Sequence, residues 1–121
     1  MTKVRTVEKE DSLEAIIEHC GDEKYIVARV SKDNVERLVL VSLPLEYHSD
    51  IVRAYKRNLD GETLQILGGG ILEINPDEKK IRTYGTSGSY GAPDRDLVED
   101  ILRRNYEGYT FDVQVTSYVR G

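Results

Sequence analysis

The chain has little of several residue types on which other protein classes depend. Its 121 residues include one cysteine, one methionine, one phenylalanine, three prolines, two histidines and no tryptophan. Because Cys20 has no partner for an internal disulfide, the chain is typical of a reducing compartment, and we predict a cytoplasmic location. The two histidines and the cysteine lie far apart and give no ligand spacing for zinc. We therefore predict no metal site.

Positive charge is also scarce. The chain carries 17 Lys and Arg against 22 Asp and Glu, for a net charge of −5. A general nucleic-acid-binding protein needs a basic face for phosphates, so this class is excluded. No apolar run approaches the roughly 20 residues of a membrane span, and residues 1–8 lack the apolar core of a secretory signal. The predicted partners therefore include neither nucleic acid nor membrane.

Short β-branched segments predict most of a sheet. Residues 25–30 and 35–43 flank a polar turn and indicate a hairpin. Residues 63–67 and 71–74 read as strands on either side of three glycines, which mark a bulge, a sharp bend or a close backbone approach. Further strands are predicted at residues 80–84 and, by alternation, 109–116. The segment 12–19 is ambiguous, with propensities that suit a short helix.

Apolar residues at helical spacing predict two helices, over residues 45–58 and 94–106. Pro44 ends the preceding strand and suits the first turn of a helix, which places His48 and Ser49 near the helix start. We predict a single α/β (α+β) domain over residues 1–121, with a mixed sheet of about five or six strands flanked by two helices. Residues 1–11 read as a charged tail or an edge element. Neither helix has a second apolar stripe, so the predicted state is a monomer.

Two segments contain candidate functional residues. Residues 83–93 form a loop rich in glycine and serine, whose N–H and hydroxyl groups can face an anion. His48 lies where helix N–H groups and the helix dipole favour a bound anion and a neutral imidazole, which can act as base or nucleophile. Taken alone, the loop is more typical of a connection, and the histidine is more typical of an exposed surface position.

Several short motifs occur in an order and at separations that resemble the small phosphohistidine phosphatase (Janus/Ocnus) family. The resemblance spans about residues 24–118 and rests on these motifs: Lys24-Tyr25, Glu46-Tyr47-His48-Ser49-Asp50-Ile51, Leu67-Gly68-Gly69-Gly70, Lys79-Lys80-Ile81, Tyr84-Gly85-Thr86-Ser87 and Tyr90-Gly91. It implies an enzyme without cofactor or metal that removes phosphate from phosphohistidine, and from phospholysine in some reports.

The resemblance also implies roles for five residues. His48 matches the catalytic histidine, as base on a water or as nucleophile. Ser49 matches a position whose backbone N–H holds phosphate, Ser87 a serine that donates its hydroxyl, Ser89 a neighbour that donates its N–H, and Lys24 a lysine near the substrate. The implied substrates are a phosphohistidine-containing protein or a small phosphoramidate.

The chain departs from the family pattern at a few positions. Ile71 stands where vertebrate members carry an arginine, and Gly88, Ser89 and Ser49 also differ. Candidates to replace the missing charge are Arg53, Lys80 and Arg82. Two other functions therefore remain open: a module that binds a phosphorylated partner without turnover, and hydrolysis of a small phosphoramidate.

Overall fold

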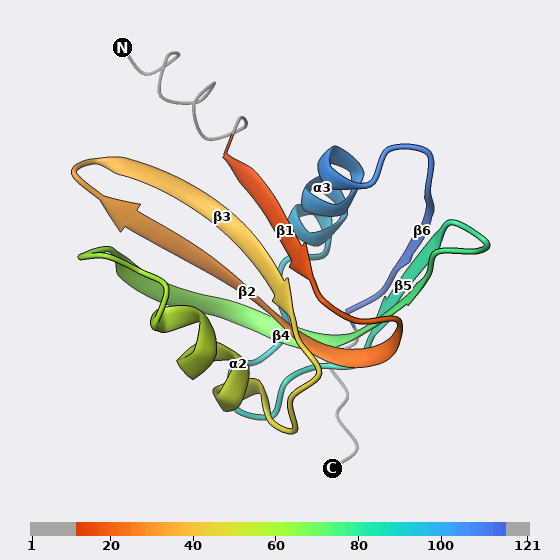
Figure 1. Ribbon diagram of the computed structural model, residues 1–121, viewed down its shortest axis with the longest axis horizontal. Helices are drawn as coiled ribbons and strands as arrows, with labels where there is room; N and C mark the ends of the chain where they lie inside the picture. Colours follow the sequence, from red (N-terminus) through yellow and green to blue (C-terminus); the bar gives the residue numbers. More distant parts are fainter. Residues whose placement is uncertain (1–11, 116–121) are drawn as a thin grey trace.

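The computed structural model describes residues 12–115. Its elements are, in chain order, β1 (Leu13–Ile17), β2 (Gly21–Lys32), β3 (Val35–Ser42), α2 (His48–Lys56), β4 (Thr63–Asn75), β5 (Lys80–Tyr84), α3 (Arg95–Asn105) and β6 (Thr110–Val113). The strands form one curled sheet in the order β1-β3-β2-β4-β5-β6 (Figure 1). The outer strands β1 and β6 pair in parallel with their neighbours, and the inner pairs are antiparallel. The predicted α+β fold, a mixed sheet with two helices, is confirmed. The segment 1–11 lies outside the described residues.

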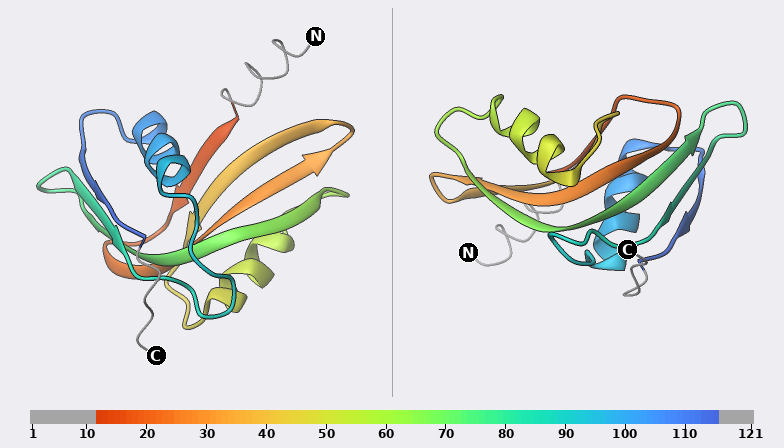
Figure 2. Two further views of the ribbon diagram at one scale, coloured as in Figure 1. Left: turned by 180° about the vertical axis from the view of Figure 1, so that it is seen from behind. Right: turned by 90° about the horizontal axis from the view of Figure 1, so that it is seen from below.

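The sheet lies between the two helices, with α2 on one face and α3 on the other (Figure 2). Successive residues of β2 point to opposite faces, as the strand period requires. Tyr25 and Val27 belong to the apolar cluster under α3, and Ile26 and Ala28 to the cluster under α2. The central strands are therefore buried on both faces, which explains why their sequences are nearly continuous apolar runs.

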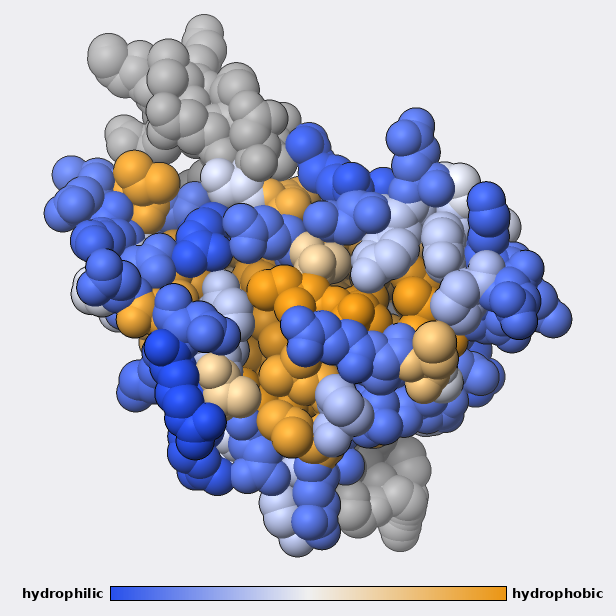
Figure 3. All heavy atoms as spheres, viewed as in Figure 1, coloured by the Kyte–Doolittle hydropathy of each residue, from blue (hydrophilic) through white to orange (hydrophobic). Residues whose placement is uncertain are grey.

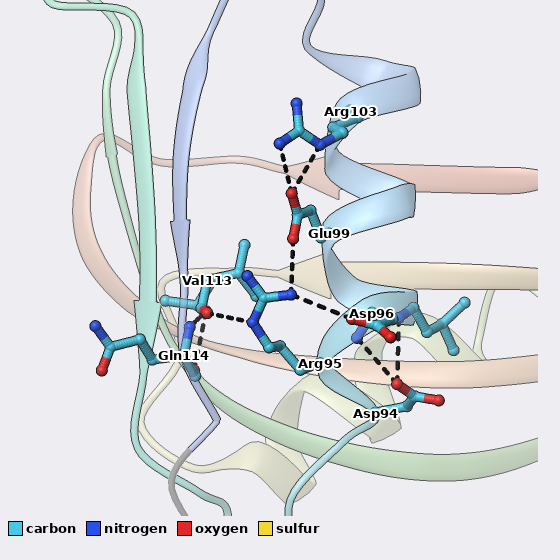
Figure 4. Close-up of polar contacts among 9 residues, drawn as sticks. Asp94, Arg95, Asp96, Glu99, Arg103, Val113 and Gln114 are labelled. Carbon is cyan, nitrogen blue, oxygen red and sulfur yellow. Dashed lines mark hydrogen bonds and ion pairs between the residues drawn. The ribbon is translucent and has the colours of Figure 1, made fainter.

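Polar contacts fix α3 at its first turn (Figure 4). The carboxylate of Asp94 accepts the backbone N–H of Asp96 at 2.9 Å, as an N-cap residue does. Arg95 donates from Nε to the carbonyl of Val113 in β6 at 3.0 Å and pairs with Glu99 at 2.8 Å. The helix is thus capped and tied to β6, and the helix predicted over residues 94–106 is confirmed.

The predicted hairpin is confirmed as β2 and β3, but the expected break at the three glycines is not present. β4 runs without interruption through Gly68, Gly69 and Gly70. Its register against β2 shifts between Val27 and Ala28, which are opposite Gly68 and Ile66, so that Leu67 is the extra residue of a bulge. The glycines therefore mark a bulge inside one strand and not the end of a strand.

The ambiguous segment 12–19 forms strand β1, so its helix-like propensities were misleading. Leu13 lies opposite Leu38 of β3, and the parallel pairing continues to Ile17. Leu13, Ala15 and Ile17 pack against the cluster under α3, while Ile16 packs against the cluster under α2. Pairing and burial at the sheet edge outweigh the local preference for helix.

Hydrophilic residues surround an apolar centre on the face seen in Figure 3. This distribution agrees with a charged fraction of 32% in the whole chain. None of the helices within residues 12–115 is long and apolar enough to cross a membrane.

Candidate functional site

The first residue of α2 is His48, so the prediction that His48 and Ser49 lie in the first helical turn is confirmed. The helix is shorter than the predicted 45–58. Its start is fixed by the carboxylate of Asp50, which accepts the Tyr47 N–H at 3.2 Å. Buried Ile51 and Tyr55 anchor the helix to the sheet. The first N–H groups of the helix have no acceptor within it and can bind an anion.

The ring of His48 is oriented by the sheet. Its Nε2 lies 3.0 Å from the carbonyl oxygen of Gly70 in β4. A carbonyl oxygen only accepts hydrogen bonds, so Nε2 carries the proton and donates it. The neutral ring then has its lone pair on Nδ1, which makes no hydrogen bond within residues 12–115. This tautomer leaves Nδ1 able to accept a proton or attack an electrophile.

The surroundings of His48 favour its neutral form. Burial lowers the pKa of His48 below its usual value of 6.5, and the nearby Lys24 ammonium lowers it further, while the hydrogen bond to Gly70 acts in the opposite direction. The direction agrees with the lowering expected from the helix start. A neutral imidazole at neutral pH is the form required of a base or nucleophile.

Gly68 and Gly69 allow two other segments to come close to β4. A Cβ on Gly69 would lie 2.5 Å from the carbonyl oxygen of Tyr25 and 3.0 Å from Cδ2 of His48. A Cβ on Gly68 would lie 2.5 Å from the backbone nitrogen of Pro93. Side chains at these positions would therefore push away both the histidine and the loop. This is the close backbone approach that was among the predictions for the three glycines.

The loop over residues 85–91 is bound to β4 at the same glycine. Ser87 donates its N–H to the carbonyl of Gly69 at 2.9 Å, and Gly69 donates its own N–H to Gly91 at 3.0 Å. The Ser87 side chain is only 1% exposed, and its Oγ accepts the N–H of Tyr90 at 3.0 Å. His48 and Ser87 thus flank Gly69, from α2 and from the loop respectively.

The other three predicted site residues are Lys24, Ser49 and Ser89. Lys24 is opposite Ile71 in the β2–β4 pairing, one residue from Gly70, and its charge acts on His48. Ser49 is exposed beside His48, and Ser89 is exposed at the loop tip. The structure therefore brings together His48, Lys24 and Ser87. Ser49 follows His48 and Ser89 lies two residues after Ser87 in the chain, and neither makes a hydrogen bond to His48 among the described residues.

The arginines considered as replacements for a charge at position 71 are already paired. Arg53 binds Asp50 at 2.7 Å, and Arg82 binds Glu73 at 3.1 Å while lying over the ring of Tyr84. Ile71 itself packs beside Gly85 at the start of the loop. Lys24 is therefore the cation whose charge reaches His48.

Groups that could hold ligands other than phosphate lie elsewhere or are not found among the described residues. Residues 12–115 contain no cluster of three or more His, Cys, Asp or Glu side chains that could hold a metal ion. A polar pocket lies away from His48, and none of the five predicted site residues lines it; its residues are Glu73, Asn75, Glu78, Lys80, Arg82 and Asp112.

The fold and the site define a small α+β domain with a histidine at a helix start beside a glycine-lined strand. The chain belongs to the Janus/Ocnus family, whose model matches residues 11–110. Sex-regulated protein janus-A of Drosophila pseudoobscura pseudoobscura is 32% identical over 84% of this chain and 74% of its own length. Sex-regulated protein janus-B of Drosophila sechellia is 28% identical over 69% of this chain and 63% of its own length. These names describe no chemical activity.

The sequence did not indicate two polar contacts, one made by His48 and one made by His19. Gly70 contributes a carbonyl oxygen, which depends on strand pairing and not on residue type. In the sequence, Gly70 was noted only as one of the three consecutive glycines. Ser42 and His19, which contact each other at 2.7 Å, are 23 residues apart and carried no signal at all.

Proposed function

We propose that this protein hydrolyses the P–N bond of phosphohistidine in proteins, without a metal ion, with His48 as the central residue. One observation above all supports the proposal: Nε2 of His48 is engaged by the Gly70 carbonyl, so that Nδ1 is the reactive nitrogen at a helix start. The lowered pKa of His48 and the charge of Lys24 support it further. The resemblance to phosphohistidine phosphatases supplies the substrate class.

Two routes use the same nitrogen. As a base, Nδ1 takes a proton from water while the water oxygen bonds to phosphorus and the P–N electron pair leaves with the substrate nitrogen. As a nucleophile, Nδ1 itself bonds to phosphorus while the P–N electron pair leaves with the substrate nitrogen, and a water oxygen later bonds to phosphorus, breaks the Nδ1–P bond and releases the phosphate. Either route leaves positive charge on the His48 ring, and the carbonyl of Gly70 stabilises it through Nε2–H.

Phosphate is bound by groups that carry positive charge or a free N–H. The proposed phosphate-binding groups are the ammonium of Lys24, whose charge acts on His48, the N–H of Ser49 in the first helical turn, and the N–H of Ser89 in the loop. The hydroxyl of Ser87 keeps its own proton for donation because its oxygen accepts from Tyr90. Because the P–N bond is labile, orientation and anion binding with one proton transfer are sufficient catalysis.

The test is phosphate release from a phosphohistidine-bearing protein and, separately, from a small phosphoramidate, with a chelator present. Release from the phosphoprotein supports the proposal. Release from the small compound alone supports a phosphoramidate hydrolase. Phosphate binding without release from either compound supports the binding module, which apolar Ile71 beside the loop favours.

Activity is expected to fall at acid pH. His48 acts in its neutral form, so kcat/KM rises with pH through the pKa of His48 and is level above it. Because burial and the charge of Lys24 lower this pKa, the midpoint is expected below 6.5. Rate profiles and NMR titration of the His48 ring measure it. A midpoint above 6.5 that coincides with the NMR titration would contradict the assignment.

Replacing Ser87 with alanine is expected to raise KM roughly three- to tenfold and to leave partial activity. The change removes the proposed hydroxyl contact and the acceptor for the Tyr90 N–H. The matched control is Ser89→Ala, because Ser89 is exposed and acts only through its backbone N–H. Steady-state kinetics on a phosphoramidate compare the two. Equal effects of both changes would argue against a role for the Ser87 hydroxyl.

A further inference from the structure

The other histidine of the chain, His19, is linked to Lys24 through Ser42. His19, in the connection between β1 and β2, places Nε2 at 2.7 Å from Oγ of Ser42. Ser42 is fully buried at the end of β3, and its hydroxyl donates to the carbonyl oxygen of Lys24 at 2.7 Å. Three segments are thus joined by two short hydrogen bonds that end on a predicted phosphate-binding residue.

The proton positions in this chain of bonds follow from the acceptor at its end. The Ser42 hydroxyl donates its proton to the Lys24 carbonyl oxygen. The Ser42 oxygen must therefore accept the hydrogen bond from Nε2 of His19. Nε2 of His19 therefore carries a proton. Nδ1 of His19 is buried and has no partner within residues 12–115.

The position of Lys24 in the sheet explains why its carbonyl needs such a donor. The β2–β3 pairing begins at Tyr25, opposite Ser42, so Lys24 lies one residue beyond the last pair. On its other side Lys24 pairs with Ile71 of β4. The Ser42 hydroxyl therefore takes the place of a strand partner. It holds the Lys24 backbone where the side chain, on the α2 face with Ile26 and Ala28, acts on His48.

We propose that His19 and Ser42 are positioning residues that hold Lys24 in place to bind the phosphoryl group at His48. This inference rests on the proposed function, because it assigns the support of one residue of that site. Within the described residues, His19 and Ser42 make no hydrogen bond to His48 or to the loop over residues 85–91. They act only through the backbone of Lys24.

The experiment compares two changes at position 19. His19→Phe keeps a ring of similar shape and removes the N–H donor, whereas His19→Gln keeps an N–H donor at about the place of Nε2. Phosphoramidate kinetics, inorganic phosphate binding, and NMR titration of His48 are measured for each. His19→Phe is expected to raise KM and the phosphate dissociation constant roughly three- to tenfold, with kcat within about twofold. It is also expected to raise the pKa of His48, and His19→Gln to restore wild-type values.

A second background isolates the route through Lys24. When His19→Phe is added to a Lys24→Met variant, it is expected to have no further effect on KM or on the titration of His48. A further loss in that background, or a lower unfolding temperature with unchanged KM and titration, would overturn the proposal in favour of a purely structural role. If wild type releases no phosphate, the proposed function fails, while phosphate binding and the His48 titration still decide the positioning role.

Discussion

Replacing His48 with alanine is expected to lower phosphate release from a phosphohistidine-bearing protein by at least about 100-fold, with the fold intact. The change removes the only ring nitrogen that the proposed mechanism uses for proton transfer or attack. It also removes the hydrogen bond to Gly70, a loss of about 1 kcal/mol of stability. The side chain is half-buried and belongs to neither apolar cluster, so the core is unaffected.

The matched control is Lys56→Ala, an exposed position in the last turn of the same helix. It is expected to leave both activity and stability near wild type. Circular dichroism and a denaturant titration establish that each variant is folded. Near wild-type turnover by a folded His48→Ala variant would remove His48 from the mechanism and with it the proposed site.

Replacing Gly69 with alanine is expected to destabilise the protein by about 2–4 kcal/mol and to abolish activity. The added Cβ would lie 2.5 Å from the Tyr25 carbonyl oxygen, a backbone atom of the paired strand that cannot rotate away. It would also lie 3.0 Å from the His48 ring. Relief of these contacts must separate β2 from β4 or displace the histidine, so stability and the His48 position change together.

Gly88→Ala is the matched control for this change. A Cβ at Gly88 would meet no atom within 4 Å, and the backbone there is not left-handed. Gly88 lies in the loop over residues 85–91, which is bound to Gly69. The Gly88→Ala change is nevertheless expected to alter the free energy of unfolding by less than about 0.5 kcal/mol. Denaturant titrations of both variants measure the difference. If Gly69→Ala were as stable as Gly88→Ala, the backbone of β4 could move away from Tyr25 and His48 at little cost in free energy. That result would contradict the close packing described for the site.

Local patterns were sufficient to predict the elements whose signals lie within one segment. The apolar stripe that includes Ile51 and Tyr55, after the strand break at Pro44, located α2 and placed His48 in its first turn. The capping of α3 by Asp94 agrees with the acidic residues expected at a helix start. These features depend on neighbours three or four residues apart, which a sequence displays directly.

Features that depend on partners far along the chain could not be predicted. Strand β1 is a strand because β3 lies beside it, not because of its own propensities. The carbonyl of Gly70 orients His48, yet any residue has a carbonyl. The contact between His19 and Ser42 depends on how the turn after β1 meets the end of β3. Register and loop path determine each of these contacts, and neither can be read from a single sequence.

The bonds that build the site join positions far apart in the chain. His48 and Gly70 are 22 residues apart, Lys24 and Ser42 are 18 apart, and His19 and Ser42 are 23 apart. Non-local contacts of this kind form late and slowly during folding, because the intervening loops must first be closed. These contacts, together with those of the loop over residues 85–91, extend from His19 to Gly91 and involve strands β2, β3 and β4. Recovery of phosphate binding during refolding is therefore expected to report the pairing of β2 with β3 and β4, and not the formation of helix α2 alone.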